Sequence, residues 1–222
     1  MYSSGPLPLR GPIPPYAGVR NATSIHMSVL KYKDMIISLI GFMGCGKSSV
    51  GRRLSELLSC PFMDLDQIIE EAEGRSIPEI FATDGEAAFR QVEQEALRTV
   101  IGHSDSLSDS KRHLVIALGG GTVMTPECAE IVHSGTTCIY LKASVDTLLA
   151  HLEGETADRP LLNAPSQCEE SEGQRGNPVL HDRITALMAL RASTYEKTAH
   201  IIIDTDGKSI ETIASEIINL YS

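Results

Sequence analysis

Residues 41–48 constrain the fold of this chain more than any other stretch. They read Gly-Phe-Met-Gly-Cys-Gly-Lys-Ser, which is the spacing G-x-x-x-x-G-K-[ST]. The loop follows an apolar run at 35–40 and precedes a segment, 46–59, whose apolar residues recur at helical spacing. Between a strand and a helix, such a loop points its backbone N–H groups at phosphate oxygens, and the helix adds its positive N-terminal end. The sequence therefore predicts a phosphate-binding loop.

Within this loop, two side chains have separate expected tasks. We expect Lys47 to reach the outer phosphates of a nucleotide and the Ser48 hydroxyl to ligate magnesium. The other expected contacts of the loop with the phosphates come from the following residues: Gly44, Cys45, Gly46 and Ser49.

The apolar runs of the chain predict a parallel sheet. They are continuous and not alternating, which indicates strands that are buried on both faces by helices. The fold class is thus α/β, with a five-stranded parallel sheet and flanking helices of the P-loop NTPase type. The expected strands are 35–40, 61–63, 114–118, 137–141 and 200–204. The expected helices are 46–59, 66–73, 77–101 with a break near 83–86, one opened by Thr125-Pro126, 144–152 and 209–220.

Length and local composition predict one folded domain. At about 150 residues per domain, 222 residues suggest a single unit with an inserted lid or subdomain. Residues 1–34 are rich in Pro and Gly without periodicity, so we expect a disordered leader or a cloning-derived extension, the alternative being an ordered arm. Residues 35–222 form the domain. The polar stretch 154–182 is long enough for a functional lid or a disordered loop.

Charge and cysteine usage exclude several classes. With 19 Lys plus Arg against 29 Asp plus Glu, the net charge is -10, which disfavours a nucleic-acid partner. No apolar run approaches the roughly 18 residues of a membrane span, so no membrane partner is expected. The 5 cysteines are odd in number and lack a CxxC pair, which indicates reduced thiols in the cytoplasm.

Other features narrow the class of P-loop protein. GTPases usually carry an N-K-x-D motif, and no Asn of this chain is followed by Lys. The chain is also small for a motor. Phosphoryl transfer from ATP to a small acceptor suits this size.

Two carboxylates follow the second expected strand. Asp64 and Asp66 can both face the phosphate loop as the chain turns, so Asp64 could hold magnesium through water while Asp66 accepts a hydroxyl proton. The alternative is a solvated pair, one member of which caps a helix.

Several further positions are candidates for ligand binding. Gly119, Gly120 and Gly121 follow the third strand and permit close approach of a ligand, or else form a plain turn. Arg90 lies on an expected helix, where an Arg is normally solvated. Arg159 in the lid segment either neutralises phosphate charge or is an idle surface residue. Arg183 or Arg191 could bind a carboxylate in bidentate fashion.

Taken together, these residues resemble the shikimate kinase family over about residues 35–220. The combination of motifs is specific to this family, although no single motif is. It consists of Gly41–Ser48, Asp64-x-Asp66, Gly74-Arg75-Ser76-Ile77 with Ile80-Phe81, Asp84-Gly85-Glu86 with Phe89-Arg90, Gly119-Gly120-Gly121, Arg159-Pro160-Leu161 and Arg191-x-x-x-Tyr195.

The resemblance implies that ATP, with Mg²⁺, phosphorylates the 3-hydroxyl of shikimate in chorismate biosynthesis. It implies that Asp66 is the base and that Arg90 and Arg191 bind the shikimate carboxylate, with the glycines 119–121 beside the ring. It also implies an acceptor-binding helical region at about 65–95, a lid at about 154–182 and phosphate contact by Arg159. We expect a monomer.

Two departures and two alternative functions accompany this resemblance. The segment between Arg159 and Arg191 is long and acidic, and Lys208 stands where an Arg of the adenine loop is common, so Lys208 is a candidate nucleotide contact. The alternatives are a related kinase that acts on gluconate or a nucleoside monophosphate, and a non-catalytic ATP-binding domain.

Overall fold

The computed structural model describes residues 35–103, 113–152 and 178–221. The expected leader at 1–34, most of the expected lid and Arg159 lie outside the described residues. Within them, five strands form one parallel sheet in the order β2-β3-β1-β4-β5. The strands are β1 (Met35–Ile40), β2 (Phe62–Asp64), β3 (His113–Ala117), β4 (Thr137–Lys142) and β5 (Ile201–Asp204). The predicted five-stranded parallel sheet is confirmed.

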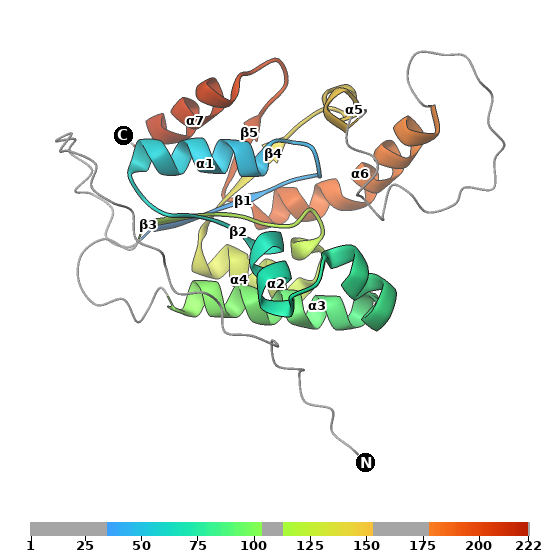
Figure 1. Ribbon diagram of the computed structural model, residues 1–222. Helices are drawn as coiled ribbons and strands as arrows, with labels where there is room; N and C mark the ends of the chain where they lie inside the picture. The colour runs from blue at the N-terminus through green and yellow to red at the C-terminus, as the bar shows by residue number, and fades with distance from the viewer. Residues whose placement is uncertain (1–34, 104–112, 153–177, 222) are drawn as a thin grey trace.

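Helices cover both faces of the sheet (Figure 1). Helices α1 (Lys47–Leu58) and α7 (Ile210–Asn219) lie on one face, and α3 (Ile77–His103) and α4 (Pro126–Gly135) lie on the other. The remaining elements are α2 (Leu65–Glu73), the short 3-10 helix η1 (Thr122–Met124), α5 (Val145–Leu152) and α6 (Pro178–Thr198). Residues 178–182 of the expected lid are thus the first residues of α6.

The central strands send alternate side chains into two hydrophobic clusters. In β1, Ile36 and Ile40 pack with α2, α3 and α4, whereas Ile37 and Leu39 pack with α1, α5 and α7. Successive strand residues point to opposite faces, and both sets are buried because helices cover both faces of the sheet. This explains why the strand sequences are continuous apolar runs.

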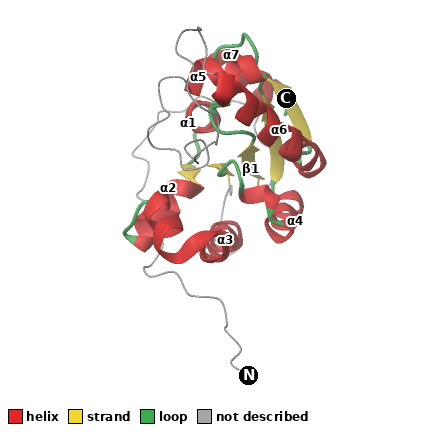
Figure 2. Cartoon of the chain, turned by 90° about the vertical axis from the view of Figure 1, so that its right-hand side faces the viewer, coloured by secondary structure: helices red, strands yellow, loops and turns green. Residues whose placement is uncertain are grey.

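Helix α3 changes direction at Gly85. This residue has φ 82° and ψ 171° inside an otherwise helical stretch, so the expected break near residues 83–86 is confirmed. A positive φ of this size is strained for a residue with a Cβ, and glycine removes that strain. The second part of α3, which carries Arg90, packs against α4 and η1, while α2 lies beside α3 (Figure 2).

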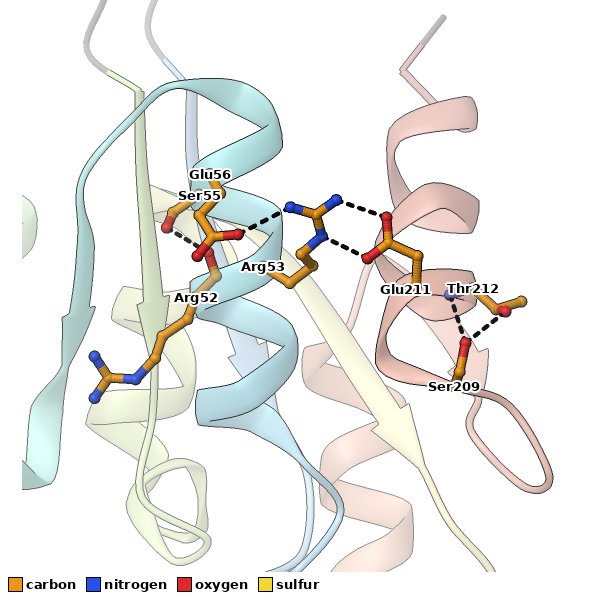
Figure 3. Close-up of polar contacts among 7 residues, drawn as sticks. All are labelled: Arg52, Arg53, Ser55, Glu56, Ser209, Glu211 and Thr212. Atoms are coloured by element: carbon orange, nitrogen blue, oxygen red, sulfur yellow. Dashed lines mark hydrogen bonds and ion pairs between the residues drawn. The ribbon is translucent and has the colours of Figure 1, made fainter. Parts of the chain in front are cut away.

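An ion pair joins α1 to α7 (Figure 3). Arg53 donates to both carboxylate oxygens of Glu211, at 2.5 and 2.7 Å, and to Glu56 at 2.9 Å. The Ser209 hydroxyl caps α7 by accepting from the Thr212 amide at 3.1 Å. Because α1 begins in the phosphate loop, these contacts fix the start of α7 relative to that loop.

None of the helices in the described ranges 35–103, 113–152 and 178–221 is long and apolar enough to cross a membrane.

Candidate active site

One cavity of about 1400 Å³ collects the sequence-predicted site residues at the carboxyl ends of the strands. This is where ligands bind in open parallel sheets. Arg159 lies outside the described residues, so its predicted role is untested. The predicted residues that line the cavity are Gly44, Cys45, Gly46, Lys47, Ser48, Ser49, Asp64, Asp66, Arg90, Gly119, Gly120, Gly121, Arg191 and Lys208.

The backbone of the phosphate loop curves around one end of this cavity and lines it. Gly44 and Gly46 have φ values of 81° and 89°, which a side chain would strain, and Lys47 begins α1. The Lys47 ammonium folds back over the loop and donates to the carbonyls of Gly41 at 3.0 Å and Phe42 at 2.9 Å. An anion at the helix N-terminus would therefore meet both backbone N–H groups and a fixed positive charge.

Ser48 and Asp64 form the part of the site that suits Mg²⁺. The Ser48 hydroxyl donates to Asp64 Oδ2 at 2.6 Å, while Asp64 Oδ1 accepts from the Asp66 amide at 3.2 Å and so caps α2. In the described part of the chain, no group of three or more His, Cys, Asp or Glu residues could hold a metal ion by itself. A hydroxyl and one carboxylate fit Mg²⁺, which completes its octahedron with phosphates and water.

Asp66 lies in the same cavity with a perturbed acidity. The pKa of Asp66 is raised from 3.8 to about 6, mainly by burial and also by the negative charge of Asp64, while the positive charge of Lys47 acts in the opposite direction. A carboxylate whose pKa lies closer to neutrality is a stronger base than an ordinary Asp. The arrangement can therefore accept a proton from a hydroxyl placed between Asp66 and the phosphate loop.

Arg90 is held at the other side of the cavity by buried Glu93 and, at 3.2 Å, by exposed Glu86. Its Nη1 donates to Glu93 Oε2 at 2.8 Å, and Glu93 in turn accepts from the Thr122 hydroxyl at 2.7 Å. Glu93 is only 1% exposed, so its charge needs these partners. Glu93 and Thr122 were not identified as site residues from the sequence. The Arg–Glu spacing of i, i+3 on a helix was the available signal for Glu93.

The three glycines admit side chains from other elements. A Cβ on Gly119 would lie 2.7 Å from Asp66 Oδ1, and one on Gly121 would lie 2.8 Å from Arg90 Nη2. The Gly120 carbonyl accepts from Tyr195 at 2.5 Å and, more weakly, from Arg191 at 3.4 Å. The segment therefore makes close approach possible and is more than a plain turn.

Arg191 is the arginine of α6 that lines the cavity, and Arg183 is not among the lining residues. Together with Arg90, Arg191 gives this end of the cavity two guanidinium groups, from α3 and α6. Two such groups can bind a carboxylate.

The opposite end of the cavity lies between α5 and the loop from β5 to α7. His151 on α5 makes a hydrogen bond of 2.8 Å through Nδ1 to the Gly44 carbonyl, so α5 is fixed to the phosphate loop. Lys208 lines the cavity and pairs with Glu216 at 2.7 Å, and Thr205 and Ile210 lie beside it. Sequence reasoning missed His151, whose position on α5 carries no motif.

Comparisons with known proteins agree on one family. The family model described as shikimate kinase matches residues 43–222. A shikimate kinase of Thermus thermophilus is 40% identical over 182 residues, which is 82% of this chain and 87% of the relative. One of Geobacter metallireducens is 40% identical over 196 residues, covering 88% and 96% of the two chains.

Solved structures give the same result. The shikimate kinase from Acinetobacter baumannii in complex with shikimate aligns with a TM-score of 0.71 and 30% identity, over 84% of this chain and 92% of that one. The shikimate kinase from Aquifex aeolicus aligns with a TM-score of 0.65 and 33% identity, over 83% and 95%.

Proposed function

The chain belongs to the shikimate kinase family, and on that premise we propose which of its residues carry out the reaction. It transfers the γ-phosphoryl group of ATP to the 3-hydroxyl of shikimate, giving shikimate 3-phosphate and ADP on the route to chorismate. The observation that carries the residue assignment is the single cavity shared by the phosphate loop, Asp66, Arg90 and Arg191.

In the proposed complex the two substrates bind end to end. The triphosphate of ATP binds over the phosphate loop, with its base toward His151 and the β5–α7 loop. The carboxylate of shikimate binds between Arg90 and Arg191, with its ring beside the glycines 119–121. The 3-hydroxyl then faces both Asp66 and the γ-phosphoryl group, so the reacting atoms are positioned for in-line transfer.

The proposed catalytic work of the protein is charge neutralisation and proton acceptance. Lys47 leaves the loop carbonyls for the phosphate oxygens and offsets charge that develops on the transferring group. Ser48, with Asp64 behind it, holds the Mg²⁺ that accompanies ATP and reduces the charge of the phosphates. Asp66 orients the hydroxyl and takes its proton as the phosphoryl group arrives. Arg159 stays a proposed phosphate contact.

A panel of acceptors tests this assignment against its alternatives. ADP release would be followed with shikimate, quinate, gluconate and nucleoside monophosphates in parallel. Two guanidinium groups favour a carboxylate over a nucleobase, and membership of the shikimate kinase family favours shikimate over quinate and gluconate, so we expect the highest turnover with shikimate. Preferred turnover with a nucleoside monophosphate or gluconate would assign the pocket to another acceptor, and absence of turnover with all acceptors would indicate a binding domain.

Arg90→Ala should raise the KM for shikimate by roughly 10- to 100-fold, as expected for the loss of hydrogen bonds to a charged group. The KM for ATP should change little because Arg90 lies away from the phosphate loop. Steady-state kinetics with each substrate varied in turn measure both. Arg90→Lys keeps the charge beside buried Glu93 and should show an intermediate KM. Arg52→Ala, on the outer face of α1, is the matched control. A rise in the KM for ATP alone would contradict the assignment.

The acidity of Asp66 predicts the pH profile. Asp66 must be ionised to accept a proton, and its pKa is raised to about 6. We expect kcat/KM for shikimate to fall as pH decreases through about 6 and to level off above about 7, since kcat/KM reports the free enzyme. Initial rates at low shikimate concentration check this. A profile that is flat down to pH about 5 would exclude a base with this pKa.

Gly119→Ala should lower kcat by about 10- to 100-fold without loss of ATP binding. The new Cβ would lie 2.7 Å from Asp66 Oδ1 and 3.0 Å from Thr122 Oγ1, so the Asp66 carboxylate must move away from the hydroxyl. Turnover assays and ADP titration measure the two effects. Gly102→Ala, where a Cβ meets nothing within 4 Å, is the control. Wild-type kcat in Gly119→Ala would show that the carboxylate position is not critical.

The proposal also extends to the organisation of the protein. We propose a monomer with residues 35–222 as a single domain and about 65–95 as its acceptor-binding region; that described residues of α2, α3 and the phosphate loop line one cavity supports the single domain. Cys45, Cys60, Cys128 and Cys138 are free and buried, which supports a reducing compartment, the cytoplasm.

A further inference from the structure

Two buried tyrosines lie together beneath the cavity but differ in their hydroxyl groups. Tyr140 on β4 and Tyr195 on α6 are 1% and 0% exposed, and their ring centroids are 5.1 Å apart. The Tyr195 hydroxyl donates to the Gly120 carbonyl at 2.5 Å. The Tyr140 hydroxyl has no hydrogen-bond partner among the described residues. The pair therefore separates the effect of a tyrosine ring from that of a bonded hydroxyl.

Gly120, in the segment after β3, lies next to both the phosphate loop and α6. A Cβ on Gly120 would be 3.3 Å from the Met43 amide and 3.6 Å from the Gly41 carbonyl, so this residue packs on the phosphate loop. Its own carbonyl also faces Arg191, whose Nη1 lies 3.4 Å away, at the outer limit of a hydrogen bond. Tyr195 is thus the close partner of this carbonyl and Arg191 the distant one, and the Tyr195 hydroxyl also interacts directly with the Arg191 guanidinium.

The half-buried Gly120 carbonyl would lose its close partner without the Tyr195 hydroxyl, and a carbonyl that is poorly paired favours a closer approach of its remaining donor. Without the Tyr195 hydroxyl, the Arg191 guanidinium is the remaining hydrogen-bond donor to the Gly120 carbonyl among the described residues. Moving Arg191 onto Gly120 would satisfy the carbonyl, but the same N–H group would then be withdrawn from a ligand in the cavity. The Gly120 carbonyl can accept both hydrogen bonds, so while Tyr195 supplies the close one, Arg191 can stay at 3.4 Å and direct its N–H groups into the cavity.

We propose that Tyr195 is a positioning residue that occupies the Gly120 carbonyl and thereby keeps the Arg191 guanidinium available to the carboxylate of the acceptor. The proposal rests on the proposed function, because it takes Arg191 as the residue that binds this carboxylate. Burial raises the pKa of Tyr195 far above its ordinary value, so the hydroxyl keeps its proton and donates throughout the working range of pH.

Tyr195→Phe tests the proposal with Tyr140→Phe as its matched control. Both changes remove one buried hydroxyl from adjacent rings and leave the packing in place. We expect Tyr195→Phe to raise the KM for shikimate by about five- to tenfold, with the KM for ATP changing less than about twofold. Tyr140→Phe should leave both constants at their wild-type values. Wild-type kinetics in Tyr195→Phe, or an equal effect in Tyr140→Phe, would overturn the proposal.

An acceptor that lacks the carboxylate charge of shikimate distinguishes positioning of Arg191 from general damage to the site. In the carboxamide of shikimate, the group that pairs with Arg191 is neutral. We expect the loss of kcat/KM caused by Tyr195→Phe to shrink to less than about twofold with this acceptor, because little interaction with Arg191 remains to lose. An equal loss with acid and amide would show that Tyr195 has a merely structural role.

A crystal structure of the variant separates this proposal from the proposed function. In Tyr195→Phe, Arg191 Nη1 should move from 3.4 Å to about 2.9 Å from the Gly120 carbonyl. An Arg191 that stays at its original distance would overturn the proposal even if wild-type protein phosphorylates shikimate. Failure of the wild-type protein to phosphorylate shikimate would instead overturn the proposed function, whatever the position of Arg191.

Discussion

Asp66→Asn should lower kcat with shikimate by about 10²–10⁴-fold, the usual contribution of a general base, while the KM for ATP stays nearly unchanged. The substitution keeps the size of the side chain and removes its ability to accept a proton. Steady-state kinetics measure both constants. Glu71→Gln on the same helix is the control, since Glu71 is exposed and contacts Gln67 outside the main cavity. A variant with wild-type kcat would require a different base.

The same substitution should stabilise the folded protein near neutral pH. Because the pKa of Asp66 is raised from 3.8 to about 6, the folded state binds more protons than the unfolded state between these values. The free energy of unfolding therefore falls as pH rises through this window, by on the order of 3 kcal/mol. Asn carries no charge that must be buried. Chemical denaturation should therefore find the variant more stable than wild type at pH about 7 and equal to it below pH about 4.

Lys47→Ala should reduce turnover by about 10²–10³-fold or more, the loss expected when a donor to developing transition-state charge is removed. Among the described residues, the ammonium donates to the carbonyls of Gly41 and Phe42 and weakly to the Cys45 sulfur, all within the loop itself, so the fold should survive. Turnover assays and thermal unfolding measure the two effects. Lys197→Ala, at the exposed end of α6, controls for the loss of one positive charge. Retained turnover in a folded Lys47→Ala protein would remove the loop lysine from the mechanism.

The fold could be predicted from sequence because its signals are local. The run at β1 is apolar at successive positions since both faces of that strand are covered, and the phosphate-loop motif fixes the turn and helix that follow. The break in α3 was also visible, because glycine at residue 85 permits the positive φ found there.

The site was only partly predictable, because its side chains are held by residues distant in sequence. The two interpretations of Asp64 were treated as alternatives, yet this carboxylate both caps α2 and accepts from Ser48. The buried acid that holds Arg90 and the contact between Tyr195 and Gly120 depend on packing of α3 and α6 against the segment after β3. The i, i+3 spacing can suggest the pair Arg90–Glu93, but periodicity and motif spacing carry no information about the burial of Glu93 or about the packing of α6.

A crystal structure with ADP, Mg²⁺ and shikimate bound together tests the central claim most directly. We expect the ring acid in the cavity beside the glycines 119–121, with its carboxylate on Arg90 and Arg191 and its 3-hydroxyl within about 3 Å of Asp66. That hydroxyl should face the phosphate end of ADP over Lys47. Shikimate bound elsewhere, or bound with its carboxylate toward Asp66 and its 3-hydroxyl away from the phosphate loop, would contradict the account.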